Sequence, residues 1–417
     1  MNSTITGILQ QFAEEASFLW FLRGKLVHAP HFSLDDLARF DDRLEAQVDG
    51  LRVGGDSSWD ICRSSLADGV VEGVFAPALL AFDSGDNDRI HEVMETVGED
   101  RAKADAVISA LGWLPFNHAE PHIRSFLRES SPFQRYIGIA ASAVHRHDPG
   151  RHLNTAVNDT FPPLIARGLR ACGELGRSSE LNDFRLQDHL TDCDDEIRFC
   201  AAWSASLAGI GTAVEVLKSF VTPDNKYADE ALNVAARCMR PGAALAWQWE
   251  LAQSPETIRL ATIGAGATGD PVLVPWLIDR MNTPALARVA GEAFTMITGV
   301  DIELEKLSGA RPEGFNAGPN DDPKDHNVAM DADDDLPWPD ADLVSAWWDK
   351  NSGCYQSGTR HLLGKPVSTD SLRVILQTGL QRQRAAAALE LALLNPGKPL
   401  FEVRAPAARQ RHGVTTL

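Results

Sequence analysis

A pattern that recurs about every 30 residues constrains the fold of this chain more than any other feature. Three segments place a hydroxyl residue before a proline and an arginine about one helical turn later: Ser131-Pro132 to Arg135, Ser254-Pro255 to Arg259, and Thr283-Pro284 to Arg288. A hydroxyl side chain can cap a helix, and proline suits the first helical position because no N–H is needed there. The pattern therefore predicts a series of helix starts.

The same register extends along the chain at intervals of 29–32 residues, through Lys103, Arg135, Arg167, Arg198, Ala228, Arg259 and Arg288. Alanine-rich runs follow these positions, and a second apolar stretch follows many of the runs, as at Ala213–Phe220 and Val272–Ile278. Two helices in about 30 residues, stacked on similar pairs, predict an all-α solenoid of antiparallel helix pairs.

The arginines of this register are Arg135, Arg167, Arg198, Arg259 and Arg288. We expect each to have a structural role, in which it reaches an acidic residue or a carbonyl of the adjacent repeat. Structural ion pairs of this kind are common, so this role is favoured over ligand binding.

Changes in composition divide the chain into four regions. We expect a helical hairpin, the repeats, an irregular connection rich in Asp, Pro and Gly, and a C-terminal helical region, at residues 1–56, 57–299, 300–342 and 343–417. The hairpin is expected to have a helix at Ser33–Leu51 capped by Ser33. The density of Asp, Pro and Gly at residues 300–335 predicts a mobile segment that the fold does not require.

The formal net charge of −19 disfavours nucleic acid as a partner, because binding to phosphates needs clustered Lys and Arg. No apolar run approaches the roughly 20 residues that span a bilayer, so membrane insertion is not expected. The apolar stretch Phe18–Leu22 lacks the basic start and the length of a signal peptide. Six scattered cysteines without a Cys-x-x-Cys pair favour reduced thiols, and we expect a cytoplasmic location.

Charge is distributed unevenly. Thirteen acidic and three basic residues lie between Asp301 and Asp342, whereas Arg360–Arg411 has nine basic and three acidic residues. The basic region either caps the repeats or recruits an acidic partner, and the capping role is favoured because terminal repeats need a polar outer face. Exposed ion pairs contribute only about 0–1 kcal/mol. We therefore expect reversing the charges of Arg409 and Arg411 to leave stability nearly unchanged.

Three motifs resemble sites for a cofactor or a metal, but each lacks part of what the site needs. The glycines of Gly264-Ala-Gly266-Ala-Thr-Gly269 are expected to end a helix, whereas a dinucleotide site needs a strand before them and a helix starting at them. His145-Arg-His147 and nearby His152 are expected to form a solvated turn. Asp331-x-Asp333-x-Asp335 lacks the glycine of a calcium loop. We expect no cofactor, no metal and no catalytic residue.

Several segments resemble an uncharacterised proteobacterial family of HEAT-like repeat proteins. The resemblance covers nearly the whole chain and is carried by these stretches: Glu14–Trp20, Leu34–Leu51, Ile297–Asp301, Leu336–Pro339, Trp347-Trp348, Gly358–Gly364 and Pro399–Pro406. It implies a HEAT-like α-solenoid. Members of the family are often encoded near type VI secretion genes, which implies a role in effector delivery.

These observations predict a non-catalytic scaffold or adaptor that binds another protein, with a secretion effector or a spike component as the partner that the resemblance implies. Candidate contacts to the partner are Trp338, Trp347, Trp348, Arg404 and Arg409. The alternative is an enzyme or a small-ligand-binding protein that uses the concave groove of the solenoid. Analysis of the purified protein for bound metal and nucleotide separates the two.

Overall fold

A computed structural model describes residues 3–177, 186–319, 324 and 329–416 of the chain. Within these residues the fold is all-α, as the sequence predicts, with 21 α-helices and one short antiparallel sheet in which β1 (His361–Leu362) pairs with β2 (Lys365–Pro366). Among the described helices, none has the length and apolar character to cross a membrane.

The chain forms two compact units. Unit 1 comprises Met1–Ala208 and Asn395–Leu417, and unit 2 comprises Gly209–Leu394. This division differs from the expected regions: residues 57–299 are split after Ala208, and residues 343–417 are split before Asn395. The second difference arises because residues 397–410 pack among helices of unit 1, as described below.

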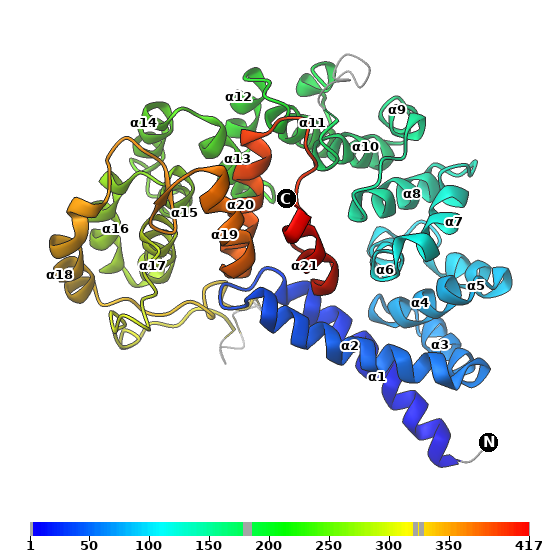
Figure 1. The fold of residues 1–417 in the computed structure, drawn as a ribbon. Helices are drawn as coiled ribbons and strands as arrows, with labels where there is room; N and C mark the ends of the chain where they lie inside the picture. The colour runs from blue at the N-terminus through cyan, green and yellow to red at the C-terminus, as the bar shows by residue number, and fades with distance from the viewer. Residues whose placement is uncertain (1–2, 178–185, 320–323, 325–328, 417) are drawn as a thin grey trace. The chain divides into compact units, whose positions relative to one another are not determined.

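Helices of unit 1 pack in sequence: α1 lies against α2 and α3, α4 against α6, α6 against α8, α8 against α10, and α10 against α11 (Figure 1). The shorter helices α5, α7 and α9 pack beside α4, α8 and α10, and α21 lies against α2. The bounds are α1 Ser3–Leu26, α2 Leu34–Gly54, α3 Asp56–Ala67, α4 Phe75–Ser84, α5 Asn87–Val97, α6 Arg101–Trp113, α7 Phe116–Phe126, α8 Pro132–Val144, α9 Arg151–Val157, α10 Pro162–Glu174, α11 Asp195–Leu207 and α21 Ala407–Thr416, with 3-10 turns at Glu72–Val74 and Asp188–Thr191.

Unit 2 repeats this mode of packing, with α13 against α15 and α15 against α17, while α12, α14 and α16 pack beside α13, α15 and α17. The α19–α20 hairpin packs through α20 against α13, and α18 packs against α16. The bounds are α12 Thr212–Ser219, α13 Ala228–Cys238, α14 Pro241–Leu251, α15 Ile258–Thr268, α16 Val274–Met281, α17 Pro284–Thr298, α18 Ala341–Asn351, α19 Thr369–Thr378 and α20 Gln381–Leu394, with 3-10 turns at Pro271–Leu273 and Ser352–Cys354.

Every position of the predicted register lies in the first two turns of a helix, on α6, α8, α10, α11, α13, α15 and α17. Side chains of Ser131 and Asp194 accept backbone N–H groups at the starts of α8 and α11, as the caps predict. Ser33 forms a capping box with Asp36 at the start of α2. Two expectations were wrong: Pro255 lies in a turn before α15 and does not start it, and the side chain of Thr283 makes no capping bond at the start of α17.

The described residues of the 300–342 connection form no α-helix before α18, as expected, but they pack against unit 2. Ile302, Leu307 and Leu336 are buried, and Ser308 forms an antiparallel bridge with Pro339. Burial of these apolar side chains argues against mobility at 300–319 and 336–342, whereas 329–335 is held by the ion pairs of Asp331 and Asp333. The rest of the expected mobile segment, at 320–323 and 325–328, lies outside the described residues.

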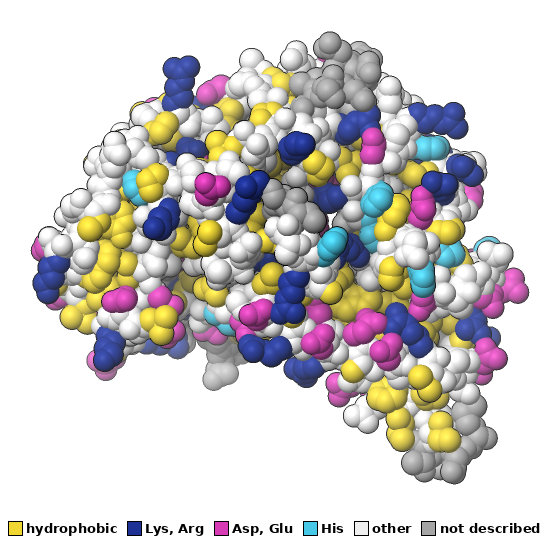
Figure 2. Space-filling view, viewed as in Figure 1, with side chains coloured by type: hydrophobic (Ala, Val, Ile, Leu, Met, Phe, Trp, Pro, Cys, Tyr) yellow, Lys and Arg dark blue, Asp and Glu magenta, His cyan; other side chains and the backbone are white. Residues whose placement is uncertain are grey.

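Acidic and basic side chains are interspersed on the face that Figure 2 shows. Apolar side chains are exposed near the N-terminal end of α1, where Ile5 and Ile8 are 51% and 47% exposed (Figure 2). Exposed apolar residues on one helix end identify a surface but do not identify what binds it.

Candidate functional site

In unit 1 residues 397–410, which are irregular up to Pro406 and then begin α21, cross the C-terminal ends of successive helices; we call them the tail segment. The N–H of Leu400 donates to the carbonyl of Glu174 at the end of α10 (3.0 Å). Arg146, just after α8, donates from Nε to the carbonyl of Leu400 (2.6 Å). Arg409 donates to the carbonyl of Gly112 at the end of α6 (2.5 Å). Carbonyls at helix ends lack intrahelical donors, so the tail segment provides partners for them.

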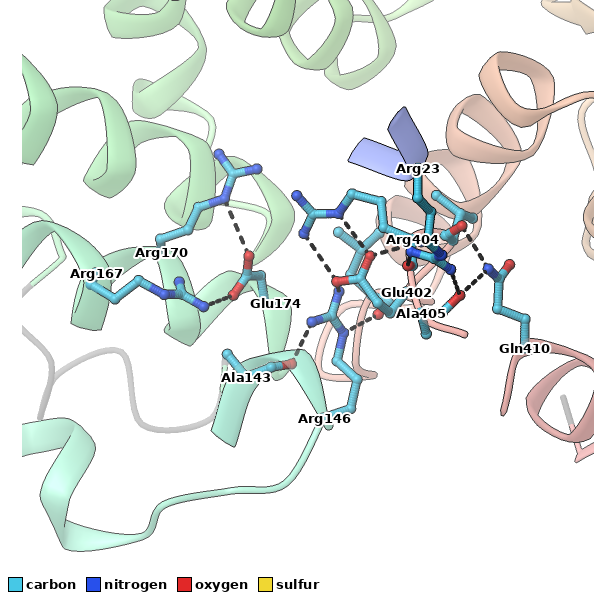
Figure 3. Close-up of polar contacts among 12 residues, drawn as sticks. Arg23, Ala143, Arg146, Arg167, Arg170, Glu174, Glu402, Arg404, Ala405 and Gln410 are labelled. Atoms are coloured by element: carbon cyan, nitrogen blue, oxygen red, sulfur yellow. Dashed lines mark hydrogen bonds and ion pairs between the residues drawn. The ribbon is translucent and has the colours of Figure 1, made fainter. Parts of the chain in front are cut away.

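The centre of the tail segment is a buried carboxylate, Glu402, between two guanidinium groups (Figure 3). Arg146 Nη2 lies 2.9 Å from one of its oxygens, and Arg404 Nε lies 2.9 Å from the other. Burial opposes ionisation, but Arg404 and Arg146 hold the pKa of Glu402 well below its usual range. A carboxylate held in its ionised form is suited to fixing this segment in place and poorly suited to donating a proton near neutral pH.

A second charged contact holds the tail segment to the N-terminal hairpin. Arg23 of α1 pairs with Asp41 of α2 (2.6 Å). It also donates to the carbonyls of Arg404 and Ala405 at 2.9 and 3.0 Å (Figure 3). Asp41 also accepts the N–H of Ala407 at 2.7 Å. The buried Arg23–Asp41 pair therefore bonds to the main chain of the tail segment through both partners.

Beside the tail segment, Glu174 pairs with Arg167 at 2.6 Å and lies 3.6 Å from Arg170, within the same helix (Figure 3). Burial opposes ionisation of Glu174, but Arg167, with Arg146 and Arg170, holds its pKa below the usual value.

His145 lies at the end of α8 and is only 8% exposed. Its Nε2 lies 2.9 Å from the carbonyl of Leu111, so this nitrogen donates in the neutral ring. Burial, with nearby Arg409, lowers the pKa of His145 to about 4. His147 stacks on Phe116. The expectation of a solvated His turn is therefore wrong for His145, which packs inside the unit.

Unit 2 has a comparable feature, residues 355–367, which we call the hook segment. Its main chain bonds to the C-terminal ends of α15 and α17: His361 N–H donates to Gly269 O (2.8 Å), and Leu363 N–H donates to Met296 O (2.8 Å). Gly364 N–H donates to the next carbonyl of α17, at 3.0 Å. These bonds resemble those of a strand added to an edge, except that helix ends provide the acceptors.

Arg360 extends the hook segment to the end of α13. It donates to the carbonyls of Arg237, Ala236 and Met239 at 2.6, 2.7 and 3.1 Å. Its guanidinium also lies 3.6 Å from the buried carboxylate of Glu390. One arginine thus serves as partner for three carbonyls at a helix end, whereas Arg409 serves two at the end of α6.

A glycine allows close approach of each segment. Gly176 follows α10 with φ +66°, and a Cβ there would lie 2.4 Å from the carbonyl carbon of Lys398. Gly269 ends α15 with φ +69°, and a Cβ there would lie 2.5 Å from His361 O. Each glycine is needed for two reasons. Residues with L side chains rarely adopt its positive φ, and a Cβ would collide with backbone atoms that cannot shift without a large energetic cost.

All five register arginines donate to a carboxylate: Arg135 to Asp159, Arg167 to Glu174, Arg198 to Asp195, Arg259 to Asp333 and Arg288 to Asp331. For Arg167 and Arg198 the acid lies on the arginine's own helix and not on the adjacent repeat. Arg259 does contact the next repeat, through the carbonyl of Ala285 at 3.3 Å.

The five residues expected to contact a partner all contact their own unit. Trp338 lies over the guanidinium of Arg288, while Trp347 packs on Phe294 and Trp348 on Tyr355. Arg404 and Arg409 belong to the tail segment described above. Contact with a partner through any of them stays a prediction.

The residues of the motifs that resemble cofactor or metal sites have structural roles in the fold. Gly264 and Gly266 lie inside α15 and Gly269 ends it, as predicted. Asp331 and Asp333 accept from arginines. Among the described residues, no group of three or more His, Cys, Asp or Glu side chains is arranged to hold a metal ion.

Sequence reasoning did not find Arg146, Glu402, Asp41 or Arg23. Their contacts join positions up to 382 residues apart, and no periodic signal connects them. Asp41, Arg360 and Glu402 lie in stretches that carry part of the family resemblance, which was the only signal for them.

Neither a scan against models of known protein families nor a search of curated proteins found a match for this chain.

Proposed function

We propose that this protein is a non-catalytic scaffold or adaptor, a HEAT-like α-solenoid that holds an extended segment of another protein. The proposal follows from how the two units hold segments of their own chain. In the tail segment, helix-end carbonyls and paired charges fix a largely irregular main chain, and in the hook segment main-chain N–H groups and Arg360 bond to helix-end carbonyls. A surface that holds extended polypeptide within the chain has the donors and acceptors to hold a similar segment in trans.

The observation that carries the proposal is the Arg23–Asp41 pair with its three hydrogen bonds to tail-segment main chain. Contacts to main chain do not depend on the side chains of the bound segment. They therefore suit binding of protein segments as a class. The family resemblance extends the proposal to delivery of a type VI secretion effector from the cytoplasm.

The test is quantitative affinity purification of the tagged full chain from its native host, followed by mass spectrometry. We expect one protein partner in near-stoichiometric yield. A bait of similar size and net charge, unrelated in sequence, controls for capture by acidity alone.

The same purified sample is analysed for metal and nucleotide. One equivalent of either, together with no stoichiometric protein partner, would replace the scaffold with the alternative, an enzyme or small-ligand binder that uses the groove of the solenoid.

A further inference from the structure

Residues 329–335 lie on the N-terminal ends of α15 and α17, held by two arginines of the repeat register. Asp333 accepts from Arg259 through both carboxylate oxygens, at 2.7 and 2.9 Å. Asp331, two positions earlier, accepts from Arg288 at 2.5 Å. The two arginines occupy equivalent places in successive repeats, so the repeat spacing sets the spacing of the two carboxylates.

Arg288 is a buried cation that lies between aromatic rings. It is 4% exposed, and its guanidinium lies 4.5 Å from the ring centre of Trp338 and 5.9 Å from that of Phe315. Its Nε is buried and makes no hydrogen bond to any described residue. The side chain thus has an aromatic cradle on its faces and a donor left for a further acceptor.

Two parts of this stretch are attached differently. Residues 336–340 are fixed by apolar burial and main chain: Leu336 is buried, Gly309 N–H donates to Trp338 O, and Asp340 N–H donates to Leu307 O, both at 2.8 Å. Residues 329–335 are attached to α15 and α17 by the two aspartates.

Three of the other side chains in 329–335 lie on the surface. Met330 is 75% exposed, and the side chains of Ala332 and Asp334 are also exposed. The main-chain N–H groups of Asp333 and Asp334 bond within the stretch, to Asp331. Residues 330–334 can therefore leave α15 and α17 while 336–340 stay in place, provided other carboxylates replace the two that depart.

We propose that the surface formed by Arg259 and Arg288 binds an acidic peptide of the Asp-x-Asp kind from the partner protein, and that Asp331–Asp333 is an intrachain occupant that competes with it. This inference rests on the proposed scaffold function and names the chemistry of the partner segment. Nearby Asp229 and Glu292 disfavour long acidic runs, since only two carboxylates find arginine partners. A tethered occupant has an effective concentration in roughly the millimolar range, so it keeps weak acidic peptides out.

The experiment measures binding of a fluorescent peptide with the sequence of residues 329–335 to the full chain, by anisotropy. We expect the variant Asp331→Asn with Asp333→Asn to bind it at least ten-fold more tightly than the wild type does. The matched control, Glu303→Gln with Asp334→Asn, makes the same change in charge at exposed positions and should behave as the wild type. A peptide with Asn at positions 331 and 333 keeps two aspartates and should not bind.

Adding Arg259→Gln to the first variant should abolish the gain. Arg259 is chosen because its side chain is 41% exposed, so its loss leaves the core unchanged. Equal binding of the Asp and Asn peptides, or equal affinity of the first variant and the wild type, overturns the proposal.

A second measurement needs no variant. Millimolar Asp peptide should increase deuterium uptake of the wild type at residues 329–335, whereas the Asn peptide should not; unchanged uptake overturns the proposal. Failure here, with a stoichiometric partner still recovered by Arg259→Gln bait, leaves the scaffold function standing and moves the partner elsewhere.

Discussion

Both units lay a stretch of chain across the C-terminal ends of their helices, but they hold it by different means. The hook segment of unit 2 is fixed mainly through main-chain N–H groups, as at His361 and Leu363. The tail segment of unit 1 is fixed largely through charged side chains, among them Arg146, Glu402 and Arg23. Main-chain hydrogen bonds require the backbone of the segment to lie close against the helix ends. Long charged side chains can instead reach a segment from a distant part of the sequence.

The comparison predicts that unit 1 depends on charge and unit 2 on backbone fit. Four sets of variants follow, in order of expected effect.

Arg146→Met should have the largest effect, because it leaves the buried Glu402 with one guanidinium only. Removing one partner of a buried pair costs about 3–5 kcal/mol. Hydrogen exchange with mass spectrometry should show lost protection in α6, α8 and α10 and little change in α13, α15 and α17. The double variant Arg146→Met with Glu402→Leu should recover most of the loss, and no recovery would mean that packing, not charge, is what Arg146 supplies.

Gly269→Ala and Gly176→Ala should each cost about 2–4 kcal/mol, from positive φ and from the approach of backbone. Gly85→Ala is the control, since Gly85 ends α4 with φ +68° and a Cβ there meets nothing within 4 Å. It should cost about 1 kcal/mol. Denaturation midpoints measure all three. If Gly176→Ala lowers the free energy of unfolding no more than Gly85→Ala does, then only unit 2 needs a glycine for close backbone approach.

His145→Gln tests the pH dependence of unit 1. The pKa of His145 falls from 6.5 to about 4 on folding, so the unfolded state binds the proton first as pH falls. The neutral ring's contribution is complete above pH 6.5 and is lost as pH falls toward 4, by about 2 kcal/mol at pH 5. Glutamine keeps a donor for Leu111 O and does not titrate. The stability difference between wild type and variant should therefore change in favour of the variant from pH 7 to pH 5; a constant difference would show that His145 does not contribute.

Arg411→Ala should have the smallest effect, below about 1 kcal/mol, because its pair with Asp35 is exposed. Arg409→Ala should cost more, since burial lowers the pKa of Arg409 and its guanidinium bonds to the end of α6. The expectation that both charges are dispensable is thus revised for Arg409. Equal thermal midpoints for the two variants would restore it.

Much of the fold was predictable because helix starts are encoded locally. Capping residues such as Ser131 and Asp194, and proline at Pro284, act within one turn, and the repeat multiplied that signal. The prediction that Pro255 starts a helix was wrong because proline is also favoured in turns. The tail segment was not predictable, since Glu402 gives no local sign of meeting Arg146. Its composition indicated only a basic region.

The return of the chain to unit 1 has a consequence for biosynthesis. Unit 2 is inserted between Ala208 and Asn395, so Arg23 meets its tail-segment carbonyls only after about 380 further residues have been made. During that interval the carbonyl ends of α6 and α10 lack the donors that the tail segment later provides, and Arg146 after α8 lacks its acceptor. Contacts of such long sequence separation form slowly. A ribosome-bound chain therefore holds an incomplete unit 1 beside a unit 2 that can already fold, and chaperones that recognise unfinished helical repeats have their opportunity in that interval.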